Sequence, residues 1–279
     1  MLTINLSELL AYSNFGQKLS KSALVVTGGS SGMGKAVLDA LTKFFPSENI
    51  VNLDLKVGFD VTNPTSIRSA LSKLDSRQDL EDIYVFSNAG LEVFFTSEGK
   101  HIDFLDDEYD INKIISVNLN SHILLVRELI KFANQSNHVR NINLIINSSI
   151  AAFCVGGASF AVYCAAKAGA SKLVTDLTNI KLQKDFKFDF IVNAIESGSV
   201  RTNIGQYDFG GNFTSDGKDF VDRSQNADME LLGGKEVSLE NIVNTVLYLF
   251  FINHAHRGVA IPIDYGLTKT TGGRDLSSD

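Results

Sequence analysis

The stretch from residue 23 to residue 34 constrains the fold more than any other part of the chain. It reads Ala-Leu-Val-Val-Thr-Gly-Gly-Ser-Ser-Gly-Met-Gly. Four apolar residues suited to a buried strand lead into a turn of small residues, and a helix-forming run over 35–44 follows at once. Glycine permits backbone angles that a Cβ forbids, and it lets amides approach an anion at the helix start. The stretch therefore predicts a strand, a tight turn and a helix N-terminus that can bind a pyrophosphate.

A Gly-rich turn after a strand also occurs as a purely structural element. The spacing Thr-Gly-x-x-x-Gly-x-Gly favours the nucleotide interpretation, although it differs from the G-x-G-x-x-G form. Asp54 ends a second apolar run over 50–53, and an acid in this place can accept hydrogen bonds from the ribose hydroxyls of a dinucleotide. An ordinary solvated aspartate is the alternative. The candidate nucleotide contacts in this part are Gly28, Ser30, Ser31, Gly32, Met33, Gly34 and Asp54.

Strand and helix patterns alternate along the rest of the chain. Strands are predicted at 23–26, 50–54, 57–61, 83–87, 143–147, 188–194 and 259–263, with helical patterns between most of them. This order predicts an α/β fold with one doubly wound, Rossmann-type parallel sheet of about seven strands and helices on both faces. Residues 1–22 are expected to form an N-terminal arm and residues 23–279 a single domain. The long Gly-rich stretch over about 203–236 is expected to be a substrate lid.

Composition and charge exclude several classes of function. The net charge of −7 and the lack of any Lys/Arg cluster argue against a nucleic-acid partner. No run is long and apolar enough to span a bilayer, and no membrane association is expected. The two cysteines have neither metal nor redox spacing, which favours a reducing, cytoplasmic location. His254 and His256 resemble a metal pair, but their place in a predicted surface loop favours no metal site.

Tyr163 and Lys167 stand one helical turn apart, so both side chains can reach the same face. A phenol has a pKa of about 10, and a nearby ammonium favours its ionised form. Such a pair can donate and accept a proton near neutral pH. A Tyr-x-x-x-Lys pattern alone is very common, so the interpretation depends on the nucleotide turn and on the serines that end the strand before this helix.

Taken together, these motifs resemble the short-chain dehydrogenase/reductase family in its single-domain form, from about residue 21 to residue 266. The resemblance implies that Tyr163 is the general acid/base, that Lys167 lowers its pKa and binds the nicotinamide ribose, that Ser149 binds the reacting oxygen, and that Asn118 positions a water. The remaining nucleotide contacts that it implies are Asp60, Val61, Asn88, Ala89, Gly90, Gly198, Val200 and Thr202.

The sequence departs from the family pattern at the serine. The family usually places this residue thirteen before the tyrosine, where this chain has Ile150. Ser149 is preferred because the Ser-Ser-x-Ala context is kept and one extra loop residue would account for the shift, while Ser148 is the alternative. The usual Pro-Gly after the sixth strand is replaced by Ser197-Gly198, and Glu196 adds a charge before it.

The resulting hypothesis is an NAD-dependent oxidoreductase that interconverts a secondary alcohol and a ketone. A protein of the same fold that only binds or senses nucleotide is the main alternative. An NAD-retaining epimerase or dehydratase is less favoured, because such relatives usually have a larger C-terminal region. The family resemblance further implies a homodimer or homotetramer. The residues expected to line a mainly apolar substrate pocket are Val93, Phe94, Phe153, Tyr207 and Phe209.

Overall fold

The computed structural model of the chain describes residues 15–153, 157–178, 180, 186–202, 204–207, 209, 212, 214–216, 218–219, 237–252 and 256–265. Most of the predicted arm and most of the predicted lid therefore lie outside the described residues. The described end of the arm is a short helix, α2 (Phe15–Ser20), which leads directly into the first strand.

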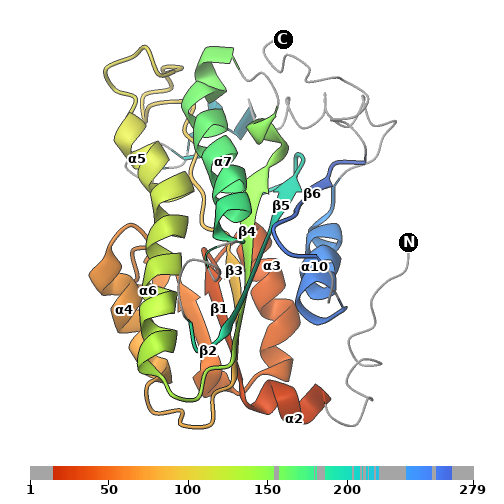
Figure 1. Cartoon of the computed structure of the whole chain (residues 1–279). Helices are drawn as coiled ribbons and strands as arrows, with labels where there is room; N and C mark the ends of the chain where they lie inside the picture. Colours follow the sequence, from red (N-terminus) through yellow and green to blue (C-terminus); the bar gives the residue numbers. More distant parts are fainter. Residues whose placement is uncertain are drawn as a thin grey trace.

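A parallel sheet of six strands forms the centre of the described part, in the order β2-β1-β3-β4-β5-β6 (Figure 1). The strands are β1 (Ser22–Thr27), β2 (Ile50–Leu53), β3 (Asp82–Ser87), β4 (Asn141–Ser149), β5 (Asp189–Ser197) and β6 (Ala260–Ile263). Because β2 and β3 pair with opposite sides of β1, the strand order reverses there. Sheets of this kind bind ligands beyond the carboxyl ends of the strands at such a point.

Helices cover both faces of the sheet, as predicted (Figure 1). One face packs against α3 (Gly32–Leu41) and α10 (Leu239–Leu247), and the other against α4 (Pro64–Leu71), α6 (Ser121–Gln135) and α7 (Gly157–Leu177). Strand β1 shows why: Ala23 and Val25 belong to one hydrophobic cluster, and Leu24 and Val26 to the other. Successive side chains of a strand point to opposite faces, so a strand covered on both sides is apolar throughout.

The strand predicted over 57–61 is wrong, which is why the sheet has six strands in place of about seven. The carboxylate of Asp54 accepts a hydrogen bond from the Lys56 amide, and a short 3-10 turn, η3 (Leu55–Val57), begins there. Gly58 then adopts a left-handed conformation with φ of 87°, and the Phe59 amide bonds back to the Asp54 carbonyl. The backbone thus closes a turn on itself, which leaves β2 at the edge of the sheet.

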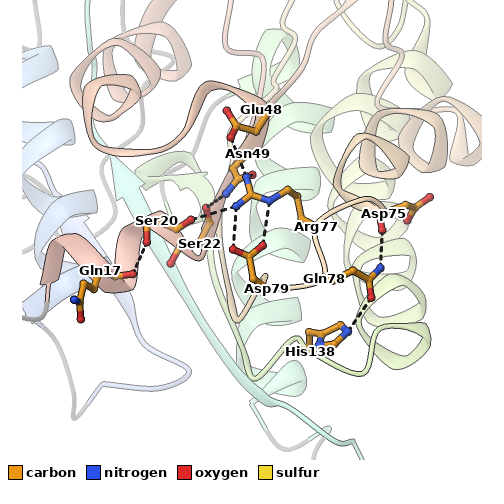
Figure 2. Close-up of polar contacts among 10 residues, drawn as sticks. All are labelled: Gln17, Ser20, Ser22, Glu48, Asn49, Asp75, Arg77, Gln78, Asp79 and His138. Atoms are coloured by element: carbon orange, nitrogen blue, oxygen red, sulfur yellow. Dashed lines mark hydrogen bonds and ion pairs between the residues drawn. The ribbon is translucent and has the colours of Figure 1, made fainter.

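Arg77 joins several segments near the amino ends of β1, β2 and β3 (Figure 2). Its guanidinium donates to Glu48 at 3.1 Å, to Asn49 at 2.5 Å, and to both carboxylate oxygens of Asp79. Asn49 in turn donates to the Ser22 carbonyl at 2.9 Å. This network ties the start of β1 to the segments before β2 and β3.

Candidate active site

The Gly-rich turn joins β1 to α3 and is packed too tightly for larger residues. A Cβ on Gly34 would lie 2.3 Å from the Gly28 carbonyl oxygen, and one on Gly28 would lie 3.0 Å from the Cα of Ala89. Gly28 and Gly32 have φ of 66° and 53°, in the left-handed region that favours glycine. The side chain of Ser31, the residue that precedes the helix, makes no capping hydrogen bond. The first amides of α3 therefore remain available to an anionic group.

Asp54 lies beside this turn at the end of β2. Its Oδ2 accepts from the Ser30 amide at 3.1 Å, and its Oδ1 accepts from the Lys56 amide at 2.8 Å. Each carboxylate oxygen can accept a further hydrogen bond, as a ribose diol would require. Asp60 lies in the turn that replaces the predicted third strand, where its Oδ1 accepts from the amide and hydroxyl of Thr62. Val61 is buried in the core beside it.

The segment after β3 is held against the Gly-rich turn by the hydroxyl of Thr27. Its Oγ1 accepts from the Asn88 amide at 2.7 Å and from the Ala89 amide at 2.9 Å. The next residue, Gly90, is open to solvent, and a Cβ there would lie 3.2 Å from Oδ1 of Asn118. The residues after β1, β2 and β3 that were predicted to bind the nucleotide thus lie together at the carboxyl end of the sheet.

Asn118 lies in a π-helical turn, η5 (Ser116–Asn120), between α5 (Ile111–Ile115) and α6. Its side chain is fully buried and exchanges two hydrogen bonds with the backbone of Leu91, at 3.2 Å and 2.6 Å. It also donates to the Ile114 carbonyl at 3.0 Å. The side chain therefore ties the helix to the segment after β3, and single-turn π-helices are frequent at functional sites.

Ser149, Tyr163 and Lys167 come together at the carboxyl end of β4. The Ser149 hydroxyl lies near enough to Tyr163 to affect its pKa and donates to the Ser197 carbonyl at 3.4 Å, and the Lys167 Nζ lies 5.6 Å from the centroid of the Tyr163 ring. Lys167 is buried and donates to the Asn147 carbonyl at 2.9 Å. A phenol, a hydroxyl and an amine thus lie close together at the same end of the sheet as the residues predicted to bind the nucleotide.

The pKa directions of this pair differ from the expected lowering at Tyr163. Loss of contact with water raises the pKa of Tyr163, the charge of Glu92 raises it further, and the hydrogen bond from Ser149 opposes both. Burial lowers the pKa of Lys167 to about 8, and the charge of Glu92 opposes that change. Desolvation disfavours the charged form of each group, so the protein alone favours a neutral phenol and a lysine that titrates near physiological pH.

Ser148, the alternative to Ser149, points into the packing against α7. Its Oγ donates to the Lys167 carbonyl at 2.9 Å and lies 2.8 Å from the Oγ of Ser171, which lies 2.8 Å from Oε1 of Glu196. Three contacts need three hydrogens, and the two hydroxyls supply only two. The buried carboxyl of Glu196 can supply the third when it is protonated, and burial raises its pKa while the hydrogen bond from Ser171 opposes that rise. Ser148 is therefore committed to a chain that joins β4, α7 and β5.

Exchanging this carboxyl for an amide should change how stability depends on pH. The pKa of Glu196 is raised above its ordinary value of 4.5. Stability that depends on its proton is fully present below that value and is lost as pH rises through the raised pKa. Between pH 5 and 9, the melting temperature of Glu196→Gln should therefore fall less than that of the parent. The difference should be about 2 to 4 °C for each kcal/mol of stability that the parent loses when Glu196 ionises. Thermal unfolding measured across this range checks the difference, with exposed Glu240→Gln as the matched control. Parallel curves for all three proteins would contradict the assignment.

The other residues that were predicted to contact the nucleotide lie at or near the carboxyl end of the sheet. Gly198 follows β5, and its amide donates to the Ile263 carbonyl at 3.0 Å. Val200 is buried, while a Cβ on Gly32 would lie 3.3 Å from the methyl group of Thr202. Thr202 therefore lies directly against the start of α3.

The expected apolar pocket is only partly assembled. Val93 is 0% and Phe94 3% exposed, so both belong to the packing beneath the surface, whereas Phe153 is 54% exposed. Tyr207 is half-buried, next to a parallel bridge between Val93 and Gly205. Phe209 packs edge to face on Tyr109 with ring centroids 5.6 Å apart.

Two buried titratable groups near Lys167 were not predicted. Glu92 is 3% exposed, and its burial raises the pKa to about 8. His122, on α6, is fully buried with its Nδ1 2.7 Å from the Ser87 hydroxyl, and burial lowers its pKa to about 3. The sequence signal for Glu92 is a single acid within the apolar run over 91–95, whereas His122 gives no signal that distinguishes it from a surface histidine.

The comparisons with known proteins point to a single family. A family model described as short chain dehydrogenase matches residues 48–210, more than half of the chain. The sequence has no significant match among curated proteins. In the part of the chain that the structure describes, no helix is long and apolar enough to cross a membrane.

Similar solved structures share the fold at low sequence identity. A short-chain type dehydrogenase/reductase from Mycobacterium marinum has 18% identity and a TM-score of 0.68, with 91% of this chain and 98% of that chain covered. Thermoplasma acidophilum aldohexose dehydrogenase has 17% identity and a TM-score of 0.65, covering 91% and 96%. The NADPH-dependent 3-quinuclidinone reductase from Rhodotorula rubra has 19% identity and a TM-score of 0.65, covering 92% and 95%.

Proposed function

Because this chain belongs to the short chain dehydrogenase family of oxidoreductases, we propose that it transfers hydride between NAD and a secondary alcohol or ketone. The observation that carries the proposal is the grouping of Ser149, Tyr163 and Lys167, with the Ser149 hydroxyl close to Tyr163 and the Lys167 amine 5.6 Å from the tyrosine ring. These groups lie at the carboxyl end of the same sheet as the turn and the carboxylate that suit a dinucleotide. The matched family segment includes all three residues.

In this proposal Tyr163 handles the proton of the reacting oxygen. During alcohol oxidation its Oη accepts the hydroxyl proton while Ser149 Oγ donates a hydrogen bond to the same oxygen, and during ketone reduction Oη returns the proton. Lys167, when charged, favours the phenolate form of Tyr163. The nicotinamide coenzyme, when bound, supplies the hydride donor or acceptor.

The residues predicted to bind a nucleotide at the carboxyl end of the sheet fit such a coenzyme. The open amides at the start of α3 suit a pyrophosphate, and Asp54 suits the ribose hydroxyls. The part of the coenzyme between adenosine and nicotinamide would lie against Asn88, Ala89 and Gly90. On its other side it would lie against the segment from Gly198 to Thr202. One structural neighbour is an NADPH-dependent reductase, so the choice between NAD and NADP is a separate prediction.

The direct test is turnover by the purified protein. We expect nicotinamide absorbance to change with at least one member of a broad panel of secondary alcohols and ketones. Tight NAD binding without turnover on any of them would favour the second candidate, a nucleotide-binding or sensing protein.

We extend the proposal to a homo-oligomer, supported by the exposed Ile111 and Ile123 on the helices next to the site, which are 40% and 43% exposed. Light scattering of the full chain tests that extension.

The two adjacent serines should differ sharply in their effects on rate. Ser149→Ala removes the hydroxyl that lies near Tyr163 and that we propose donates to the reacting oxygen, and we expect kcat to fall about 100-fold or more. Ser148→Ala breaks the chain to Ser171, and we expect a loss of stability with kcat lowered less than about tenfold. Steady-state kinetics together with thermal unfolding separate the two effects. The reverse order of kcat values would assign the reaction to Ser148.

A further inference from the structure

Asn52, on β2, contacts the Gly-rich turn through both ends of its side-chain amide. Its Oδ1 accepts from the Gly29 amide at 3.2 Å, and its Nδ2 donates to the Ser30 Oγ at 3.4 Å. A carboxamide has one acceptor end and one donor end, and the Gly29 N–H can only donate. That N–H therefore fixes the orientation of the Asn52 amide, with its donor end toward Ser30.

The close approach of Asn52 explains why a glycine occupies position 29. Gly28 and Gly32 have a positive φ, whereas Gly29 does not. A Cβ on Gly29 would lie 2.5 Å from Oδ1 of Asn52 and 3.0 Å from its Cγ, closer than normal packing allows. The glycine at this position therefore permits the contact with β2, and its backbone needs no left-handed conformation.

The end of β2 accepts hydrogen bonds from three successive amides of the turn. The amides of residues 28–30 donate, in that order, to the Leu53 carbonyl at 2.9 Å, to the Asn52 side chain at 3.2 Å and to the Asp54 carboxylate at 3.1 Å. Asn52 and Asp54 can both face the turn because residues two apart in an extended chain point the same way. These three amides are therefore already bonded, which leaves an anionic group to the first amides of α3.

The hydroxyl of Ser30 is a donor that β2 does not engage. Ser30 is half-buried, its Oγ accepts from Asn52, and this Oγ donates to no acceptor among the residues that the structure describes. A hydroxyl whose oxygen accepts a hydrogen bond still has its own hydrogen to donate. The amide of the same residue lies 3.1 Å from Oδ2 of Asp54, so this hydrogen is available next to the carboxylate that suits the adenosine ribose.

We propose that Asn52 is a positioning residue for coenzyme binding, which holds the Ser30 hydroxyl as a hydrogen-bond donor to the ribose hydroxyl that donates to Asp54. A ribose hydroxyl both donates and accepts, so the carboxylate and the serine can bind the same group from two sides. Asn52 itself does not touch the coenzyme. The inference rests on the proposed function only in that the ligand is an adenine nucleotide, and it requires no turnover.

The test compares two nucleotides that differ only in their ribose hydroxyls. ADP has both hydroxyls and 2′,3′-dideoxy-ADP has neither, and calorimetric titration of the full chain measures the affinity for each. In the parent, ADP should bind at least about tenfold more tightly, because the Asp54 carboxylate accepts from the diol. Asn52→Ala should weaken the binding of ADP by about three- to tenfold and that of the dideoxy nucleotide by less than about twofold.

Ser30→Ala tests the same contact from the other side. It removes the hydroxyl, and it should lower the preference for ADP over the dideoxy nucleotide by about three- to tenfold. Because Asn52 is proposed to act through Ser30, adding Asn52→Ala to Ser30→Ala should lower the preference by less than about twofold more, whereas independent effects would multiply. Asn134→Ala, at an exposed position of α6, is the matched control and should leave both affinities unchanged.

Two results would overturn the inference. The first is an equal loss of affinity for both nucleotides in folded Asn52→Ala, which would indicate a general loosening of the turn. The second is an unchanged preference in Ser30→Ala, which decides the matter also if Asn52→Ala does not fold. A parent that shows the expected preference but turns over no alcohol or ketone would refute the proposed function and preserve the inference, and a parent that binds neither nucleotide would refute both.

Discussion

Replacing Tyr163 with phenylalanine is expected to lower kcat by about 10²- to 10⁴-fold, the contribution typical of a positioned acid/base group. The substitution keeps the ring, and the 5.6 Å approach of the Lys167 amine to that ring needs no hydroxyl. The affinity for NAD should therefore change by less than about threefold, because only the proton donor is lost. Steady-state kinetics with any working substrate, together with a nucleotide titration, measure both quantities.

Tyr248→Phe provides a matched control, because Tyr248 lies in η7 (Tyr248–Ile252), which packs with the opposite helical layer. It should keep kcat close to the parental value. Retention of more than about a tenth of the activity in Tyr163→Phe would remove this residue from the proposed role. Equal losses in both variants would point to a general effect on folding.

The alternation of strands and helices could be predicted because a sheet covered on both faces requires apolar runs of strand length. The run over 57–61 could not be assigned correctly, because its backbone can form hydrogen bonds either with a neighbouring strand or within a local turn. The Asp54 carboxylate captures the Lys56 amide, and Gly58 takes a positive φ that L side chains rarely adopt. Local turn chemistry thus prevails over the β-branched pattern, and it leaves Leu55 and Val57 74% and 52% exposed.

The two serines that end β4 show which part of a site the sequence leaves open. Both stand at the carboxyl end of the strand, where the catalytic position was expected. Alternation along the strand gives Ser148 the face of Leu144 and Ile146, which α7 covers. Ser149, one residue later, lies near Tyr163 and donates to the Ser197 carbonyl at 3.4 Å. A spacing pattern counts residues along the chain, but the face of the strand decides which hydroxyl meets the tyrosine.

The buried acids were beyond sequence reasoning for a different reason. An isolated glutamate is usually solvated, and its burial depends on partners distant in the sequence. Glu92 is held by Tyr109, and Glu196 is held by Ser171 on α7. Only the fold brings these pairs together, and it also buries both carboxyls, which raises the pKa of each while the hydrogen bonds from Tyr109 and Ser171 oppose that rise.

Coenzyme choice should favour NAD over NADP because of Asp54. Two amides hold its carboxylate beside the Gly-rich turn, at 3.1 Å and 2.8 Å, so it cannot easily turn away from an incoming phosphate. At about 5 Å and an effective dielectric of about 20, a 2′-phosphate charge is repelled by about 3 kcal/mol, or roughly two orders of magnitude in affinity. Lys35, the basic residue closest to the turn in sequence, is paired with Asp39 at 2.5 Å.

The ratio of kcat/KM for NAD over that for NADP should therefore exceed about ten, a margin below the Coulomb value. Asp54→Asn keeps an oxygen for the Ser30 amide but removes the charge, so the ratio should fall by at least about tenfold through better use of NADP. Asp60→Asn is the matched control, because its oxygen is already bonded to Thr62, and it should leave the ratio unchanged. Titration of each nucleotide gives the same comparison without a substrate. Equal use of both coenzymes by the parent would mean that a cation such as Lys56, whose own amide binds Asp54, neutralises the carboxylate and binds the phosphate.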